Sequence, residues 1–166
     1  MKVCFSILGE PQGKGRPRFV RNSTYVRTYT PEKTATYENL VKLEYERQCG
    51  GARFRDDECV ELIINAFYGI PKSTSKRKRE LMLGEAIRPI KKPDVDNVTK
   101  IIADSLNDIA YKDDAQIVDS TVRKFYSDMP RVQVIIQTAR NSVHDGKNCD
   151  GSDCEKEFCG TEDSCE

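Results

Sequence analysis

Four carboxylates, an amide and several lysines are gathered in two short stretches in the middle of the chain. Residues 91–100 read KKPDVDNVTK and residues 112–114 read KDD. Carboxylates this close repel one another and raise each other's pKa, so the cluster is most easily explained if a divalent cation neutralises it. Lysines on both sides favour a phosphodiester as the group on which the cation acts. The pattern predicts the chemistry of a metal-dependent nuclease.

A helix is expected to begin after Asp94, and at about 100° per residue its residues divide into two faces. The apolar face is expected in the core and consists of Val98, Ile101, Ile102, Ser105 and Ile109. The polar face is expected to carry the chemistry and consists of Asp96, Asn97, Lys100, Asp104 and Asn107.

Metal ligands are expected at the start of this helix and just beyond its end. Asp94 and Asp96 lie near its positive N-terminal end, and the returning chain could bring Asp113 or Asp114 back to them. Three oxygen ligands with open water positions suit Mg²⁺. Lys100, one turn beyond Asp96, could orient the attacking water or offset charge on the phosphate.

Two further polar residues of the helix are expected to support the site. Asn97 supplies a neutral oxygen ligand or a hydrogen bond. Asp104 lies eight residues from Asp96, roughly 12 Å along the axis, which is too far to share the same ion easily. We therefore expect Asp104 outside the metal shell, paired with Lys100.

A structural reading without catalysis is open for each acid taken singly. Asp94 could be a helix cap, Asp96 and Lys100 an ordinary surface pair, and residues 113–114 a turn. These readings do not explain why lysines crowd the same acids or why the helix divides so cleanly.

The elements predicted around the motif define an α/β protein. Strands are expected at residues 3–8, 58–70, 116–126 and 132–138, with the second at the centre of the sheet. Helices are expected from Pro31 to about residue 48, with Thr30 as N-cap and a stop at Gly50, and at residues 76–84. Residues 13–19 are rich in Gly and Pro and are predicted to form a loop.

Basic residues in three regions are candidates for contacts with nucleic acid, where arginine binds phosphate in a bidentate fashion. They are Lys14, Arg16 and Arg18 in the loop, Lys76, Arg77, Lys78 and Arg79 on the second helix, and Lys91, Lys92 and Lys112 beside the acids. Ordinary solvated charge is the alternative for each group.

Charge is distributed unevenly along the 166 residues, although the formal net charge is zero. Residues 1–140 carry 25 basic and 19 acidic side chains, a net charge of +6, and are expected to form one domain. Residues 141–166 carry a net charge of −6 and four cysteines, and are expected to be a disordered tail. A zinc site of these cysteines with His144 is an alternative, although no C-x-x-C pair supports it.

The expected compartment is the cytoplasm. No apolar run approaches the roughly 20 residues of a membrane helix, and no secretory signal is recognisable. The seven cysteines are therefore expected to be reduced.

These motifs together resemble the RusA family of Holliday-junction resolvases. The resemblance spans about residues 3–138 and rests on GRPRF at 15–19, YTP at 29–31, PDVDNVTK at 93–100, DSLN at 104–107 and YKDDAQI at 111–117. It implies a small mixed sheet packed against helices, a homodimer, four-way or branched DNA as substrate, and paired nicks made with Mg²⁺ or Mn²⁺ in recombination and repair. It also implies a bacterial or phage gene.

Residue by residue, the resemblance implies Asp94, Asp96 and Asp114 as metal-binding catalytic acids and Lys100 as the catalytic lysine. Asp113 is then the weaker candidate of its pair. Two other functions are open: a catalytically silent module that binds branched DNA, and an interaction protein that acts through the acidic tail.

Overall fold

The computed structural model of the chain describes residues 1–16, 18–21, 26–29 and 31–139, with the backbone alone for the second and third of these ranges. The predicted tail, the Thr30 cap and the Arg18 side chain lie outside the described residues.

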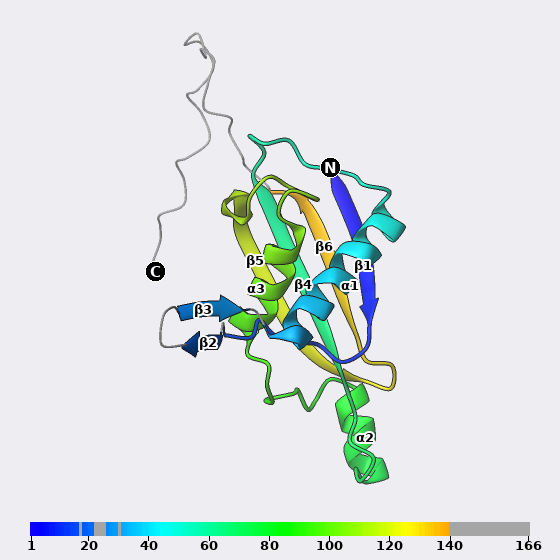
Figure 1. Cartoon of the computed structure of the whole chain (residues 1–166). Helices are drawn as coiled ribbons and strands as arrows, with labels where there is room; N and C mark the ends of the chain where they lie inside the picture. Colours follow the sequence, from blue (N-terminus) through cyan, green and yellow to red (C-terminus); the bar gives the residue numbers. More distant parts are fainter. Residues whose placement is uncertain (17, 22–25, 30, 140–166) are drawn as a thin grey trace, which may run out of the picture.

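A four-stranded mixed sheet forms the centre of the molecule, with the strand order β1-β6-β4-β5 (Figure 1). The strands are β1 (Lys2–Leu8), β4 (Val60–Gly69), β5 (Ile117–Ser127) and β6 (Arg131–Thr138). β6 pairs antiparallel with both β1 and β4, whereas β5 runs parallel to β4. The predicted strands and the mixed α/β fold are confirmed, and β4 lies inside the sheet as predicted.

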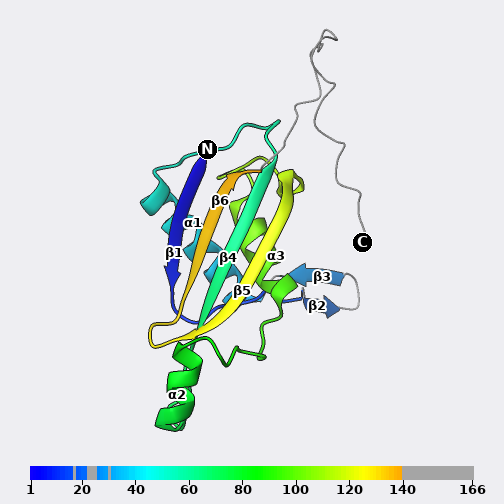
Figure 2. The same cartoon turned by 180° about the vertical axis from the view of Figure 1, so that it is seen from behind.

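Two helices cover one face of this sheet. α1 (Glu32–Cys49) packs against β1, and α3 (Val95–Leu106) packs against α1 and β5. The parallel pairing of β4 and β5 requires a long connection, which contains α2 (Lys76–Leu83) and α3. Figure 2 shows the opposite face of the sheet without a helix, and α2 projects beyond one end of the sheet.

The core lies between the sheet and the two helices. Burial alternates along β4, so that Leu62 and Ile64 face the helices. Phe5 of β1 meets Tyr45 of α1 edge to face, with ring centroids 5.3 Å apart. Each such side chain stabilises the fold by about 1.5–3 kcal/mol when it leaves water. This packing fixes α3, and the acids at its start, against the sheet.

The first helix ends as its sequence predicts. Gly50 takes a left-handed conformation with φ 61°, which glycine adopts without strain, and its N–H bonds the carbonyl of Glu46. At the other end the helix begins one residue later than predicted: Pro31, not Thr30, occupies the N-cap position, and its carbonyl accepts hydrogen bonds from the amides of Thr34 and Ala35. None of the helices in the described ranges is long and apolar enough to cross a bilayer.

The prediction of an uninterrupted loop at residues 13–19 was wrong at its end. β2 (Arg18–Arg21) and β3 (Val26–Tyr29) pair antiparallel in a separate two-stranded sheet. Valine, threonine and tyrosine favour extended structure, but the neighbouring Gly and Pro dominate the local pattern. A hairpin this short gives little periodicity to recognise.

Candidate active site

Helix α3 positions the predicted catalytic residues by burying its other face. Ile101, Ile102 and Leu106 are fully buried, while Asp96 and Lys100 are exposed. The predicted division of the helix is confirmed, although the helix ends at Leu106, so Ile109 is only partly buried and lies beyond it.

Asp94 sits at the N-cap position of α3 without using its side chain as a cap. Its backbone is extended and its carbonyl accepts the amide of Val98, but its carboxylate makes no capping hydrogen bond. Within the described part of the chain Asp96 and Lys100 form no ion pair with each other. Neither a helix cap at Asp94 nor an ion pair between Asp96 and Lys100 therefore explains these residues.

The predicted site residues line two hollows that share the first turns of α3. We call the first, of about 500 Å³, the Asp96 hollow; it is lined by Asp96, Thr99, Lys100, Ala103, Asp114, Ile117 and Ser120. We call the second, of about 780 Å³, the Asp94 hollow; it is lined by Asp94, Asn97, Lys91, Lys92, Pro93, Tyr68 and residues 10–14 and 16. The structure thus brings Asp96, Lys100 and Asp114 together and places Asp94 in the neighbouring hollow.

Asp114 lies in a locally negative environment. It begins the short 3-10 helix η1 (Asp114–Gln116), and the side chain of Asp113 caps this helix by accepting the amide of Ala115 at 2.9 Å. Burial raises the pKa of Asp114, and the charges of Asp104 and Asp113, with their hydrogen bonds to it, raise it further. Asp113 is thus occupied as a cap, and Asp114 carries the charge that a cation would relieve.

Asp104 does not pair with Lys100, contrary to expectation. Its Oδ2 lies 2.9 Å from Nζ of Lys14, and its carboxyl also interacts with Asp114. The same Lys14 ammonium contacts Oε1 of Glu38 on α1. Burial lowers the pKa of Lys14, but the hydrogen bonds to both acids more than offset this and leave it raised. Lys14 therefore joins the loop, α1 and α3 rather than standing free for a ligand.

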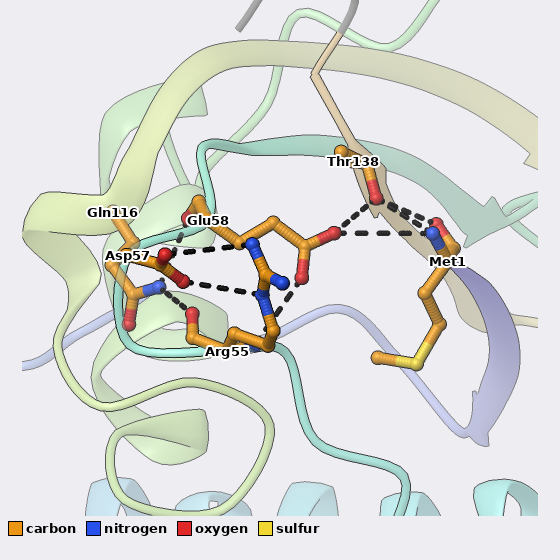
Figure 3. Close-up of polar contacts among 6 residues, drawn as sticks. All are labelled: Met1, Arg55, Asp57, Glu58, Gln116 and Thr138. Atoms are coloured by element: carbon orange, nitrogen blue, oxygen red, sulfur yellow. Dashed lines mark hydrogen bonds and ion pairs between the residues drawn. The ribbon is translucent and has the colours of Figure 1, made fainter. Parts of the chain in front are cut away.

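The end of the acidic motif is fixed by Gln116. Its Nε2 donates to the carbonyls of Arg55 and Glu58, at 2.7 and 3.0 Å, and its Oε1 accepts the amide of Lys112. Figure 3 shows Gln116 reaching the backbone of the loop before β4 in this way. Gln116 thus holds η1, and with it Asp114, against the body of the protein.

The segment before Asp94 is held by two residues that sequence analysis did not single out. Nζ of Lys124, on β5, donates to the carbonyls of Lys91 and Pro93 at 2.5 and 3.0 Å. The hydroxyl of Tyr68, on β4, donates to the same Pro93 carbonyl at 3.3 Å. Burial lowers the pKa of Lys124, partly opposed by the charge of Asp94. Both residues lie more than 20 positions from Asp94 in sequence, so only the fold brings them there.

The remaining basic candidates are spread over the surface. Of the four on α2, Arg79 pairs with Asp128 at 2.5 Å, and Lys76, Arg77 and Lys78 are exposed on the projecting helix (Figure 2). Lys112 lies 3.7 Å from Asp56, outside both hollows.

The three predicted ligands do not converge into one closed metal site. Among the residues that the structure describes, no three Asp, Glu, His or Cys side chains are grouped so as to hold an ion. Asp96 and Asp114 nevertheless share one hollow, where burial and then the neighbouring charges of Asp104 and Asp113 raise the pKa of Asp114. Two carboxylates open to water fit a hard cation such as Mg²⁺, which keeps several water ligands.

Comparison with known proteins assigns a family to this arrangement. The family model described as "Endodeoxyribonuclease RusA" matches residues 9–137. A protein of Bacillus subtilis (strain 168), named "Uncharacterized protein YqaN", is 37% identical over 137 residues, which is 81% of this chain and 95% of that protein. All residues that line the two hollows lie within the range that the family model matches.

Proposed function

We propose, since the chain belongs to the RusA family of endodeoxyribonucleases, that it resolves Holliday junctions by paired, metal-dependent nicks during recombination and repair. The observation that carries this proposal is the grouping of Asp96, Lys100 and Asp114 around one hollow at the start of α3. As a protein encoded by a bacterium or a phage, it would act in the cytoplasm.

Asp96 and Asp114 would hold the cation, Mg²⁺ or Mn²⁺, which supplies an activated water and neutralises charge on the phosphate. Lys100 faces the same hollow with no ion pair to Asp96, so its ammonium is available to the negative charge that develops on the reacting phosphate. Asp94 would complete the ligand set from the neighbouring hollow once DNA and metal are bound. Asn97, Asp104 and Asp113 would support these groups without touching the metal.

DNA would be held through its backbone. Lys91, Lys92 and Arg16 border the Asp94 hollow, and Lys76, Arg77 and Lys78 project on α2, where they could reach an arm of the junction. Binding of this kind reads shape and charge and weakens steeply as salt is added.

A homodimer would place two such sites on one junction, as paired nicks require. The helix-free face of the sheet, seen in Figure 2, is the surface that we propose for a second copy. It carries the half-buried Ile63 and Ile135 beside a stack of Phe67 on Phe125, with ring centroids 5.3 Å apart. Guanidinium groups of Arg131 and Arg88 cover the two ends of this stack.

Dimerisation can be measured by light scattering on the purified protein. We expect a dimer, and we expect Ile63→Asp to shift it to a monomer, because a charge would be buried at the interface. Leu43→Asp, the same kind of change at an exposed residue of α1 on the other side of the sheet, is the matched control. A monomeric wild-type protein that still makes paired nicks would contradict this part of the proposal.

The substrate is tested with a synthetic four-way junction and a linear duplex of the same sequence, each incubated with Mg²⁺. We expect symmetric nicks in the junction and little cutting of the duplex. Equal cutting of both would contradict junction selectivity. Binding of the junction without any cut would favour the catalytically silent module.

A further inference from the structure

We infer that the Asp94 hollow is a preformed binding site for a phosphate next to the scissile one, on the same DNA strand. This inference rests on the proposed nuclease function and extends it, because it assigns a ligand to a hollow that lies beside the metal-binding acids. The strand would then cross the first turn of α3, with one phosphate in each hollow.

One rim of the Asp94 hollow is the loop of residues 10–16, which is fixed in place. The amide of Lys14 donates to the carbonyl of Asn97 at 2.9 Å. A Cβ at Gly13 would lie 2.6 Å from Cβ of Pro93, and a Cβ at Gly15 would lie 2.6 Å from Oγ1 of Thr34. Both glycines are therefore needed for the loop to fit between α1 and the start of α3.

The opposite rim is the segment of residues 91–93, which is fixed from the sheet. Lys124 and Tyr68 donate to its carbonyls from β5 and β4, as described above. The side chains of Lys91 and Lys92 can then face the hollow while their backbone is held. A site with both rims fixed loses little entropy when it binds a ligand.

The charges around the Asp94 hollow favour an anion. It is lined by four basic side chains and by two acids, Glu10 and Asp94. Lys14 is neutralised by Glu38 and Asp104, but Arg16, Lys91 and Lys92 form no ion pair with any residue that the structure describes. The carboxylate of Glu10 accepts a hydrogen bond from the amide of Gly69 at 3.0 Å, so part of its charge is already satisfied by the protein. Three available cations beside a catalytic acid suit a phosphodiester.

The volume of the Asp94 hollow, about 780 Å³, lies within the range of small-ligand sites, roughly 300–1,000 Å³. Its position next to Asp94 and Asn97 leaves the Asp96 hollow for the reacting phosphate. A strand held at two successive phosphates would be aligned for in-line attack at one of them.

Single neutral methylphosphonates test the inference when they are placed one position at a time around the cut in a synthetic four-way junction. Junction affinity is measured without divalent metal by fluorescence anisotropy, and cutting is measured with Mg²⁺. For the wild-type protein we expect one position next to the cut, on the cut strand, to weaken binding about tenfold. For Lys92→Ala and Arg16→Ala we expect weaker binding overall and no further loss from that same position.

Lys2→Ala, an exposed change on β1, is the matched control and should keep the full sensitivity to that position. If every methylphosphonate weakens junction binding by Lys92→Ala and Arg16→Ala as much as it weakens binding by the wild-type protein, the inference is overturned. It is also overturned if the position at which the effects are coupled lies on another strand. Coupling in binding without any cut would support the phosphate site and contradict the nuclease function, whereas cutting without coupling would do the reverse.

Discussion

At the scale of single residues, the acidic motif is held in place by side chains that come from distant parts of the fold. Lys124, Tyr68 and Glu38 reach the site from elements far away along the chain, and nothing local distinguishes them from other strand or helix residues. Asp104 was predicted with the wrong partner because its helical neighbour Lys100 is closer in sequence than Lys14.

Asp114→Asn should stabilise the metal-free protein slightly. A carboxyl whose pKa is raised in the folded state is destabilised when ionised, so its stabilising contribution is present at low pH and is lost as pH rises through the folded pKa. Removing the charge at neutral pH should raise the free energy of unfolding by less than about 1 kcal/mol, because solvent screens an exposed group.

The same variant tests the metal. Addition of Mg²⁺ should raise the melting temperature of the wild-type protein but not that of Asp114→Asn, as thermal denaturation would show. Equal stabilisation of both proteins by Mg²⁺ would remove Asp114 from the metal site.

At the scale of elements, every long helix and strand followed from periodicity and from Gly and Pro stops. The hairpin of β2 and β3 did not, because four-residue strands carry too little pattern. The docking of the loop at residues 10–16 onto α3 was also invisible in sequence, since it depends on the space around Gly13 and Gly15.

Gly13→Ala tests this docking. The added methyl would overlap Cβ of Pro93 and press on Cβ of Asn97, so the loop must move away from the start of α3. We expect a loss of about 1–3 kcal/mol in chemical denaturation, with slower junction cutting. Gly84→Ala, at the end of α2 with φ −80°, is the control: its Cβ would lie 3.2 Å from the carbonyl oxygen of Glu80, so we expect a smaller loss of stability and unchanged cutting. Unchanged stability and cutting in Gly13→Ala would show that the loop does not need this position.

At the scale of the whole molecule, the two ends of the described chain meet beside the loop that carries Glu58 (Figure 3). Thr138 of β6 donates to Glu58, and the Met1 amino group lies 3.9 Å from the same carboxylate. The hydrogen bond from Thr138, with one from the backbone amide of Arg55, lowers the pKa of Glu58. This carboxylate links β1, β6 and the start of β4.

Stability should therefore depend on pH through Glu58. A lowered folded pKa gives stability that is present above the ordinary value of 4.5 and is lost as pH falls through the folded value. Glu58→Gln should cost about 1 kcal/mol at neutral pH, and the difference from the wild-type protein should shrink below pH 4.5, as urea denaturation at several pH values would show. A constant difference across this range would contradict the assignment.

The central claim is that Asp96, with Lys100 and Asp114, forms the catalytic centre. The most direct measurement compares cutting and binding of a four-way junction by Asp96→Asn and by Glu46→Gln, an exposed change on α1, in the presence of Mg²⁺. We predict that Asp96→Asn cuts at least about 100-fold more slowly and still binds the junction, while Glu46→Gln behaves as the wild-type protein. Cutting by Asp96→Asn at the wild-type rate would contradict the claim.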